Sequence, residues 1–363
     1  MKAVICTGKS KLEVIEMEKP KISGDQVLVR MKVSGICGSD VERYHFPEAL
    51  RNPETNEIVV TGHEPTGIVE EIGRCVTNLK IGDRVMIYHK MGCGKCKYCL
   101  EGRTYFCKDC NALAFPLHGA CAEYVSSDAL NCLKLPEDFT FEDGAVMSCG
   151  GGTGFEAIKK IDISGTDTVA VVGMGPVGLA SLITAKARGA KIIAIDFSEK
   201  RLNLAKSWGA DYTICNKDDK LVENAYNLWE REWIPAMQSV KEVYDVTNGE
   251  GANAVVISTD NIQARINGIY CAAKESRVVT VGMLGEGVHE EFQQVFNAIA
   301  FRELKVFGTN VWPISNYFEM IDFFRKHQIS IGKIVTHKYP IDDAEEAFKM
   351  AASQDTGKVA LVF

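Results

Sequence analysis

The stretch TVAVVGMGPVG, residues 168–178, decides the fold of this chain. It starts as an uncharged apolar run, passes through a turn rich in glycine and continues as a helical pattern. The alternation of strand and helix is repeated at residues 191–195 and 199–208. Further strands are expected at 254–257, 277–281 and 304–308. Strands that alternate with helices in this way predict an α/β fold with a doubly wound parallel sheet.

The turn within this stretch has the pattern G-x-G-x-x-G, and each glycine has a physical role. Gly173 permits the tight turn, Gly175 lets backbone N–H groups approach a pyrophosphate, and Gly178 allows the helix to pack closely on the strand. Pro176 and Val177 begin the helix, whose N-terminus favours anionic charge. The alternative is a turn without a ligand, but the strand before it and the helix after it favour a dinucleotide site.

The end of the next strand indicates which dinucleotide binds. Asp196 lies 23 residues after Gly173, where a carboxylate can accept hydrogen bonds from ribose hydroxyls. The same carboxylate would repel a 2′-phosphate, which favours NAD over NADP. Arg201 follows five residues later and weakens this preference. These residues together predict a nucleotide-binding domain of the Rossmann type, with NAD as its cofactor.

The composition is that of a globular chain with about two to three domains. Of the 363 residues, 46% are hydrophobic and 25% are charged, as in average folded proteins. Lys and Arg number 41 against 48 Asp and Glu, and the resulting net charge of −7 disfavours nucleic acid as a partner. Residues 1–11 contain no signal-peptide core, and glycines and a proline break the uncharged run 168–185 as a membrane span. We therefore expect a cytoplasmic protein with no membrane partner.

The residues before position 150 follow a different pattern. Short β-rich runs separated by Gly, Pro and Asp predict an irregular, partly open barrel, and the runs are 3–6, 27–33, 68–72 and 84–88. Strand and helix segments outside the Rossmann repeat return at 332–363. We expect one domain to be inserted into the other, with residues 1–150 and 305–363 in the barrel domain and 151–304 in the Rossmann domain.

The segment 220–244 is polar and has a helical pattern, which Pro235 interrupts. Trp229 and Trp233 lie four residues apart and would share one helical face. We interpret them as a pair that packs against the sheet, because aromatic stripes at helical spacing usually belong to a core. A ligand site is the alternative.

Four of the 13 cysteines lie close together. Their spacing is Cys93-x2-Cys96-x2-Cys99-x7-Cys107, and four thiolates at such spacing can close a tetrahedral zinc site. An iron–sulfur run would place the fourth cysteine three residues on and follow it with proline. Because four protein ligands leave no open position, we expect this zinc to be structural. Cys110 is an alternative fourth ligand.

Three separate motifs supply a second set of metal ligands. They are GICGSD at 35–40, GHE at 62–64 and SCG at 148–150. Taken singly, a histidine beside a glutamate is more often a structural pair, and a cysteine more often a small buried apolar residue. Together, Cys37, His63 and Cys149 form a three-ligand set that leaves a fourth zinc position open for water or substrate.

In this order the motifs resemble those of the zinc-dependent medium-chain alcohol and polyol dehydrogenases, and the resemblance covers essentially the whole chain. It implies a GroES-like, partly open β-barrel catalytic domain with an inserted Rossmann domain. It also implies one catalytic zinc on Cys37, His63 and Cys149 beside one structural zinc. Sorbitol-type and threonine-type members have a carboxylate as the third ligand, so Cys149 matches the alcohol-dehydrogenase pattern.

The resemblance also implies roles for residues around these ligands. Glu64 matches a carboxylate that can approach the metal, and Asp40 matches the residue that orients the histidine ligand. Ser39 matches the hydroxyl that passes the substrate proton outward. Thr153 matches a residue near the nicotinamide, and Lys358 a basic residue that faces the cofactor pyrophosphate.

Two positions differ from the family and indicate the substrate. Glu42 stands where the family has the histidine that ends the proton relay, so either Glu42 accepts the proton or the relay ends at Ser39 and water. His89 lies where simple-alcohol enzymes have an aromatic residue that lines the substrate pocket. A pocket with hydrogen-bonding partners rejects analogues that cannot pair with them. These residues predict the oxidation of a secondary hydroxyl of a polyol, sugar or sugar acid, or the reverse reaction, unless His89 packs away from the pocket.

Other functions remain as alternatives. The chain could oxidise simple primary or secondary alcohols, or bind NAD without catalysis, although all three ligands and Ser39 are present. A zinc adaptor for protein or nucleic acid is a further alternative, and the four-cysteine segment is locally basic but lacks a recognition helix. The resemblance implies a homodimer or homotetramer built through the sheet edge at 304–308. Residues 257–261 replace the family's acidic strand end and small-residue turn on the adenine side, which leaves the cofactor contacts there open.

Overall fold

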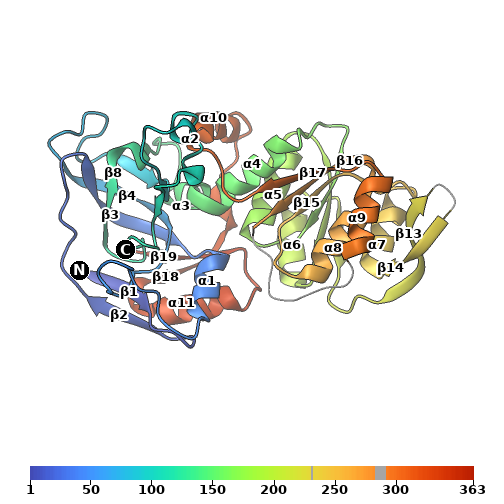
Figure 1. Cartoon of the computed structure of the whole chain (residues 1–363), viewed down its shortest axis with the longest axis horizontal. Helices are drawn as coiled ribbons and strands as arrows, with labels where there is room; N and C mark the ends of the chain where they lie inside the picture. The colour runs from blue at the N-terminus through green and yellow to red at the C-terminus, as the bar shows by residue number, and fades with distance from the viewer. Residues whose placement is uncertain (230–231, 283–291) are drawn as a thin grey trace. The chain divides into compact units, whose positions relative to one another are not determined.

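The computed structural model describes residues 1–229, 232–282 and 292–363, which form two compact units. The first unit contains Met1–Gly152 and Val311–Phe363, and the second contains Thr153–Asn310 (Figure 1). The second unit is therefore inserted into the chain of the first. The expected boundary between residues 304 and 305 is wrong, because the strand β17 (Lys305–Thr309) pairs with its neighbour in the sheet of the second unit.

The second unit is built on a six-stranded sheet whose neighbouring strands are all parallel. Its order is β12 (Tyr212–Cys215), β11 (Lys191–Asp196), β10 (Thr168–Val172), β15 (Ala252–Ile257), β16 (Ala272–Val281) and β17. Its helices are α4 (Gly152–Lys160), α5 (Pro176–Ala187), α6 (Glu199–Ser207), α7 (Gln238–Val246), α8 (Ile262–Tyr270) and α9 (Phe292–Phe301). The chain order of the strands reverses at β10, so the sheet is doubly wound, as the sequence predicts.

The central strands are apolar on both faces. In β10 and β11 every residue from Val169 to Val172 and from Ile192 to Asp196 is buried. A parallel sheet covered by helices requires such continuous apolar strands, because neither face meets water. The uninterrupted apolar run in the sequence is thus explained by its position in the middle of the sheet.

The segment 220–244 does not form the predicted helix. Its first part is an antiparallel hairpin of β13 (Leu221–Trp229) and β14 (Glu232–Met237), and only α7 is helical. Pro235 cannot continue a helix, and the aromatic and β-branched residues of this segment favour strands. Ala225 and Ala236 join the hairpin to the core of the second unit. The expected packing of the Trp229 and Trp233 side chains lies outside the described residues.

The first unit contains a seven-stranded sheet that is antiparallel except for one strand pair. The parallel pair is β18 (Val335–Pro340) and β19 (Lys358–Val362). The remaining strands are β3 (Gln26–Gly35), β4 (Glu64–Ile72), β5 (Arg84–Ile87), β8 (Tyr124–Asp128) and β9 (Cys132–Lys134). The β-rich runs expected in this part of the sequence are confirmed, because each lies in a strand or overlaps one.

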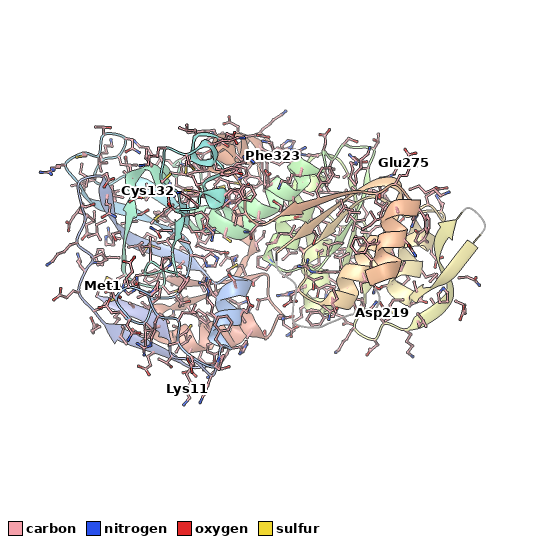
Figure 2. All side chains as sticks on the ribbon, viewed as in Figure 1. Met1, Lys11, Cys132, Asp219, Glu275 and Phe323 are labelled. Carbon is pink, nitrogen blue, oxygen red and sulfur yellow. The ribbon has the colours of Figure 1, made fainter. Side chains whose placement is uncertain are left out.

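Shorter elements complete the first unit. Two strand pairs are β1 (Lys2–Cys6) with β2 (Leu12–Glu16) and β6 (Lys90–Met91) with β7 (Asn111–Ala112). The helices are α1 (Gly38–Tyr44), α2 (Lys97–Leu100), α3 (Phe141–Val146), α10 (Tyr317–Lys326) and α11 (Ala344–Ala352). Figure 2 shows the side chains that fill the space between these elements; Cys132, labelled there, belongs to a buried cluster between the strands. Among the described residues, no helix combines the length and the apolar character that a membrane crossing needs.

Candidate active site and metal centres

Four residues that are distant in the sequence bring metal-binding atoms together in the first unit. They are Cys37, His63, Glu64 and Cys149, and their ligand atoms all lie within 4.8 Å of one another. Cys37 follows β3 and caps the N-terminus of α1, His63 directly precedes β4, and Glu64 is the first residue of β4. Cys149 lies in a π-helical turn, Met147–Gly151. Such turns are rare and occur frequently at functional sites.

The pairing of β3 with β4 explains why the first three of these residues meet. Gly35 at the end of β3 pairs with Glu64 at the start of β4. A Cβ atom at Gly35 would overlap the carboxylate of Glu64, so only glycine leaves room for that side chain. The chain then turns from β3 directly into α1, which places Cys37 beside the same carboxylate.

Asp40 orients His63, as the family resemblance implies. Its fully buried carboxylate lies 3.1 Å from His63 Nδ1 through Oδ1, and accepts a hydrogen bond from the Cys37 backbone N–H at 3.0 Å through Oδ2. A carboxylate can only accept, so His63 Nδ1 carries the hydrogen. His63 Nε2 is therefore the nitrogen that would bind a metal, after release of its proton, and it lies 3.6 Å from Cys149 Sγ.

The charges of this group agree with a metal site. Burial disfavours a charged His63, but the charges of Asp40 and Cys37 outweigh it and raise the pKa of His63 to about 10. The hydrogen bond from Cys149 lowers the pKa of the Cys37 thiol well below its usual range. Burial raises the pKa of Glu64 to about 7, against the opposing charge of Lys358. The hydrogen bond to Cys37 raises the pKa of the Cys149 thiol well above its usual range. A metal ion bound by both sulfur atoms would replace the proton that they share.

The donor set fits zinc. Two cysteines and one histidine are the protein ligands of a catalytic zinc in one of its common forms, which leaves a fourth position open. Glu64 Oε1 is fully buried and, among the described residues, accepts no hydrogen bond. An unsatisfied carboxylate oxygen so close to the three ligands matches the expected role of Glu64 beside the metal.

Lys358 lies beside the first metal group. Its side chain is buried, and Lys358 Nζ forms an ion pair with Glu64 Oε2 at 2.5 Å and donates to the Ile36 carbonyl at 3.2 Å. Burial alone would lower the pKa of Lys358, but the neighbouring Glu64 and Cys37 raise it. Both partners of the ammonium group belong to the metal-binding region, and the prediction that this residue faces the cofactor pyrophosphate stays a prediction.

The second metal group consists of the four predicted cysteines. Cys93, Cys96, Cys99 and Cys107 place their sulfur atoms within 4.8 Å of one another, and Cys96 Sγ lies 3.5 Å from Cys99 Sγ. Zinc–sulfur bonds of about 2.3 Å in a tetrahedron require sulfur separations of about 3.8 Å, so the group fits zinc. Cys110 is outside it and donates to the Asn111 carbonyl. Four sulfur ligands leave no open position, which supports a structural role.

The structure places His89 next to the first metal group. Its ring lies 5.0 Å from that of His63, centre to centre, and His89 is buried. Burial and the nearby His63 charge hold the pKa of His89 well below its usual range, so the imidazole is neutral. His89 Nδ1 lies 3.2 Å from the carbonyl of Ser148, the residue before Cys149. The pocket-lining role of His89 stays a prediction, and its position beside His63 is the observation on which the proposed function draws.

Ser39 and Glu42 lie on one face of α1, three residues apart, and so are neighbours on the helix surface. Ser39 is half-buried and Glu42 is exposed. No hydrogen bond or ion pair of the Glu42 carboxylate is formed within residues 1–229, 232–282 and 292–363. A free carboxylate one helical turn beyond Ser39 remains suited to receive a proton or to bind a polar substrate.

The dinucleotide turn of the second unit has the predicted shape. Gly173 has a φ of +92°, and a Cβ atom at Gly178 would overlap the Gly173 carbonyl. Among the described residues, a Cβ atom at Gly175 would meet Arg201 alone, at 4.0 Å, so the backbone there leaves room for a ligand. Pro176 and Val177 form the first turn of α5. This geometry fits a pyrophosphate at the helix N-terminus.

Asp196 stands at the end of β11, beside this turn. Its buried carboxylate accepts hydrogen bonds from the Met174 N–H at 2.5 Å and the Ser198 N–H at 2.8 Å. Thr153, which the resemblance assigns to the nicotinamide region, is buried near the start of α4. In the divergent segment 257–261, the Ser258 hydroxyl lies 2.9 Å from the Gly173 carbonyl, so this serine supports the glycine turn.

Comparison with known proteins agrees with both units. Residues 23–137 match the alcohol dehydrogenase GroES-like domain, and residues 176–326 match the zinc-binding dehydrogenase domain. An uncharacterised zinc-type alcohol dehydrogenase-like protein of Escherichia coli is 31% identical, with 100% of this chain and 99% of the relative aligned. An alcohol dehydrogenase of Geobacillus stearothermophilus is 30% identical over 99% of this chain and 98% of its own. The crystal structure of galactitol-1-phosphate dehydrogenase from Escherichia coli has a TM-score of 0.84 and 25% identity, and all of both chains is covered.

The fold and the two cysteine-containing groups define an oxidoreductase with a GroES-like unit and a Rossmann unit. The chain belongs to the zinc-dependent medium-chain alcohol dehydrogenase family. The family predicted from the sequence is thus confirmed.

Three contacts of this site were not predicted from the sequence. They are the Lys358–Glu64 ion pair, the hydrogen bond of His89 to Ser148 and a second hydrogen bond to the same carbonyl from Trp312, at 3.3 Å. Each joins residues separated by more than 50 positions, and two of the contacts use a backbone carbonyl. No motif marks such contacts, because a backbone carbonyl is common to every residue.

Proposed function

We propose that this protein oxidises a secondary hydroxyl of a polyol, sugar or sugar acid with zinc and NAD, or reduces the corresponding ketone. The observation that supports this substrate class is the position of His89. It places a neutral imidazole beside His63, where simple-alcohol enzymes of the family have an apolar aromatic ring. A hydrogen-bonding group in that place discriminates between substrates that pair with it and substrates that leave it unpaired.

Cys37, His63 and Cys149 would hold the catalytic zinc, and Cys93, Cys96, Cys99 and Cys107 the structural zinc. When bound, the catalytic zinc supplies a Lewis acid and NAD supplies the hydride acceptor. Asp40 keeps the ring of His63 in position for the metal through its hydrogen bond to Nδ1. Glu64 places a buried negative charge beside the three ligands, and Lys358 balances that charge.

The proton of the substrate hydroxyl leaves along α1 in this proposal. Ser39 accepts it and passes it outward, and the exposed Glu42 carboxylate, three residues further along α1, transfers it to water. In the second unit, the glycine turn and the α5 N-terminus bind the NAD pyrophosphate, and Asp196 binds the ribose hydroxyls. Arg201 and Thr153 are the further residues that we propose to contact the cofactor.

The test is NADH formation by the zinc-loaded protein with polyols, sugars and sugar acids beside short primary and secondary alcohols. We expect a higher kcat/KM for the polyhydroxy compounds. H89F is the matched variant, because it introduces the aromatic residue of the simple-alcohol enzymes, and it should lower this preference. A wild-type preference for plain alcohols would favour the alternative function, and no turnover with NAD or NADP would favour an inactive dinucleotide-binding protein.

We further propose a cytoplasmic homodimer or homotetramer without a nucleic-acid partner. Two observations support this: the edge strand β17 exposes the apolar side chains of Val306 and Phe307, and a four-cysteine metal group requires the free thiols of a reducing compartment. Analytical ultracentrifugation of the wild type and of V306D tests the assembly. A monomeric wild type would contradict it.

A further inference from the structure

One backbone carbonyl connects the predicted substrate pocket to the metal-binding turn. The Ser148 carbonyl lies 3.2 Å from His89 Nδ1 and accepts a hydrogen bond from the indole N–H of Trp312 at 3.3 Å. Ser148 directly precedes Cys149 in the π-helical turn. All of these residues are buried, so water does not compete for the carbonyl. His89 and Trp312 therefore meet at one oxygen atom of the metal-binding turn.

The surroundings of Trp312 hold its ring in one place. Trp312 is the largest fully buried side chain among the described residues. A Cβ atom at Gly152 would overlap its indole ring, so the ring occupies the space that this glycine leaves. Its other side meets the ring of Tyr88 edge-on, with centres 4.9 Å apart, and the Tyr88 O–H donates to the Trp312 carbonyl at 2.6 Å. Trp312 thus contacts the residue before His89 and the turn that carries Cys149.

The four-cysteine segment supports both ends of this arrangement. The Gly102 carbonyl accepts a hydrogen bond from the Ile314 N–H at 2.9 Å, two residues after Trp312. The Thr104 hydroxyl donates to the Lys90 carbonyl at 2.8 Å, one residue after His89. The segment between Cys93 and Cys107 therefore holds the chain beside Trp312 and the chain beside His89 at the same time.

The shared carbonyl determines which nitrogen of His89 carries the hydrogen. A carbonyl oxygen only accepts, so His89 Nδ1 must donate. In a neutral imidazole the second nitrogen, Nε2, is then an acceptor. An acceptor in a substrate pocket pairs with a hydroxyl group of the substrate and not with an ether or a methyl group.

We propose that Trp312 is a positioning residue for substrate recognition: through the Ser148 carbonyl it holds His89 in the Nδ1–H form, so that His89 Nε2 accepts a hydrogen bond from a second hydroxyl of the substrate. This inference rests on the proposed function, and it names the chemical group that the pocket recognises. That group is a second hydroxyl of the substrate, for which a vicinal diol is the simplest test compound. Trp312 acts through His89 and does not contact the substrate.

The kinetic test uses three matched compounds: butane-2,3-diol, butan-2-ol and 3-methoxybutan-2-ol. The wild type should prefer the diol over both others, because only the diol offers a second O–H. H89F should abolish this preference. W312F removes the indole N–H and should raise KM for the diol by about three- to tenfold, the usual effect of one lost buried hydrogen bond, with a smaller change in kcat. W312F should raise KM for butan-2-ol less than it raises KM for the diol.

The double variant H89F/W312F separates positioning from a general structural effect. If Trp312 acts through His89, the loss of discrimination in the double variant equals that of H89F alone. Additive losses would overturn the proposal. Y317F is the matched control, since Tyr317 is also a buried aromatic residue whose polar atom donates to a backbone carbonyl of the same unit. Y317F should keep the wild-type preference.

A spectroscopic measurement tests the positioning without turnover. Long-range ¹H–¹⁵N NMR correlations of the zinc-loaded, ¹⁵N-histidine-labelled protein report the protonated nitrogen of each histidine, and H89F identifies the signals of His89. The wild type should show the Nδ1–H form, and W312F a measurable share of the Nε2–H form. Y88F, which removes the hydrogen bond to the Trp312 carbonyl, should act in the same direction and serves if W312F does not fold.

The outcomes distinguish the two proposals. A wild type that does not prefer the diol contradicts the proposed substrate class. A wild type that prefers the diol, with W312F unchanged in both preference and NMR form, contradicts the positioning role alone.

Discussion

The substitution D40N tests how the buried carboxylate maintains the first metal group. Asp40 receives two N–H groups, His63 Nδ1 at 3.1 Å and the Cys37 backbone at 3.0 Å, and it is fully buried. An amide has one accepting atom in place of two, so one of these donors would face an NH₂ group. We expect the zinc affinity of this group to fall about 10- to 100-fold, which corresponds to about 1.4–2.7 kcal/mol.

The assay is competition between the protein and a fluorescent zinc chelator, with the zinc content measured by mass spectrometry. Two zinc ions should be released from the wild type in separate steps, and only the step of the catalytic group should shift in D40N. D138N is the control, because Asp138 pairs with Arg325 on the surface of the same unit and belongs to neither metal group. If D40N binds both zinc ions as the wild type does, Asp40 does not orient His63 and the argument fails.

Three further predictions follow from the same structure. G178A should fail to fold or to bind NADH, since the added Cβ would overlap a carbonyl. G175A should fold normally, as judged by circular dichroism, and bind NADH more weakly in a fluorescence titration. Equal NADH binding by G175A and the wild type would contradict the assigned turn. C96S should lose one zinc of two and lower the thermal stability, and an unchanged metal content would exclude Cys96 as a ligand. Iodoacetamide at pH 8 should modify the exposed Cys75 quickly and Cys132 hardly at all. Burial raises the pKa of the Cys132 thiol to about 12 and leaves little reactive thiolate. Peptide mass spectrometry measures both modification rates, and equal rates would contradict the burial of Cys132.

The sequence by itself determined the features that depend on local pattern. The strand, glycine turn and helix of residues 168–187 are consecutive, so their hydrophobic pattern and the three glycines predict the βα unit directly. The spacing of Cys93, Cys96, Cys99 and Cys107 is also local, because a short loop can bring these sulfur atoms together without the rest of the fold. The Cys37, His63 and Cys149 group spans 113 positions, and only the order of the family motifs made it predictable.

The tertiary structure decided what depends on competing or distant contacts. In the segment 221–237, aromatic residues and a proline compete with a helical pattern, and packing of the hairpin on the core determined the result. Lys358 pairs with Glu64 because the antiparallel pairing of β19 with β3, and of β3 with β4, brings the ends of three strands together. His89 and Trp312 share the Ser148 carbonyl although 223 residues separate them. Sequence patterns describe side chains within one element, whereas these contacts arise where the folded backbone brings separate elements together.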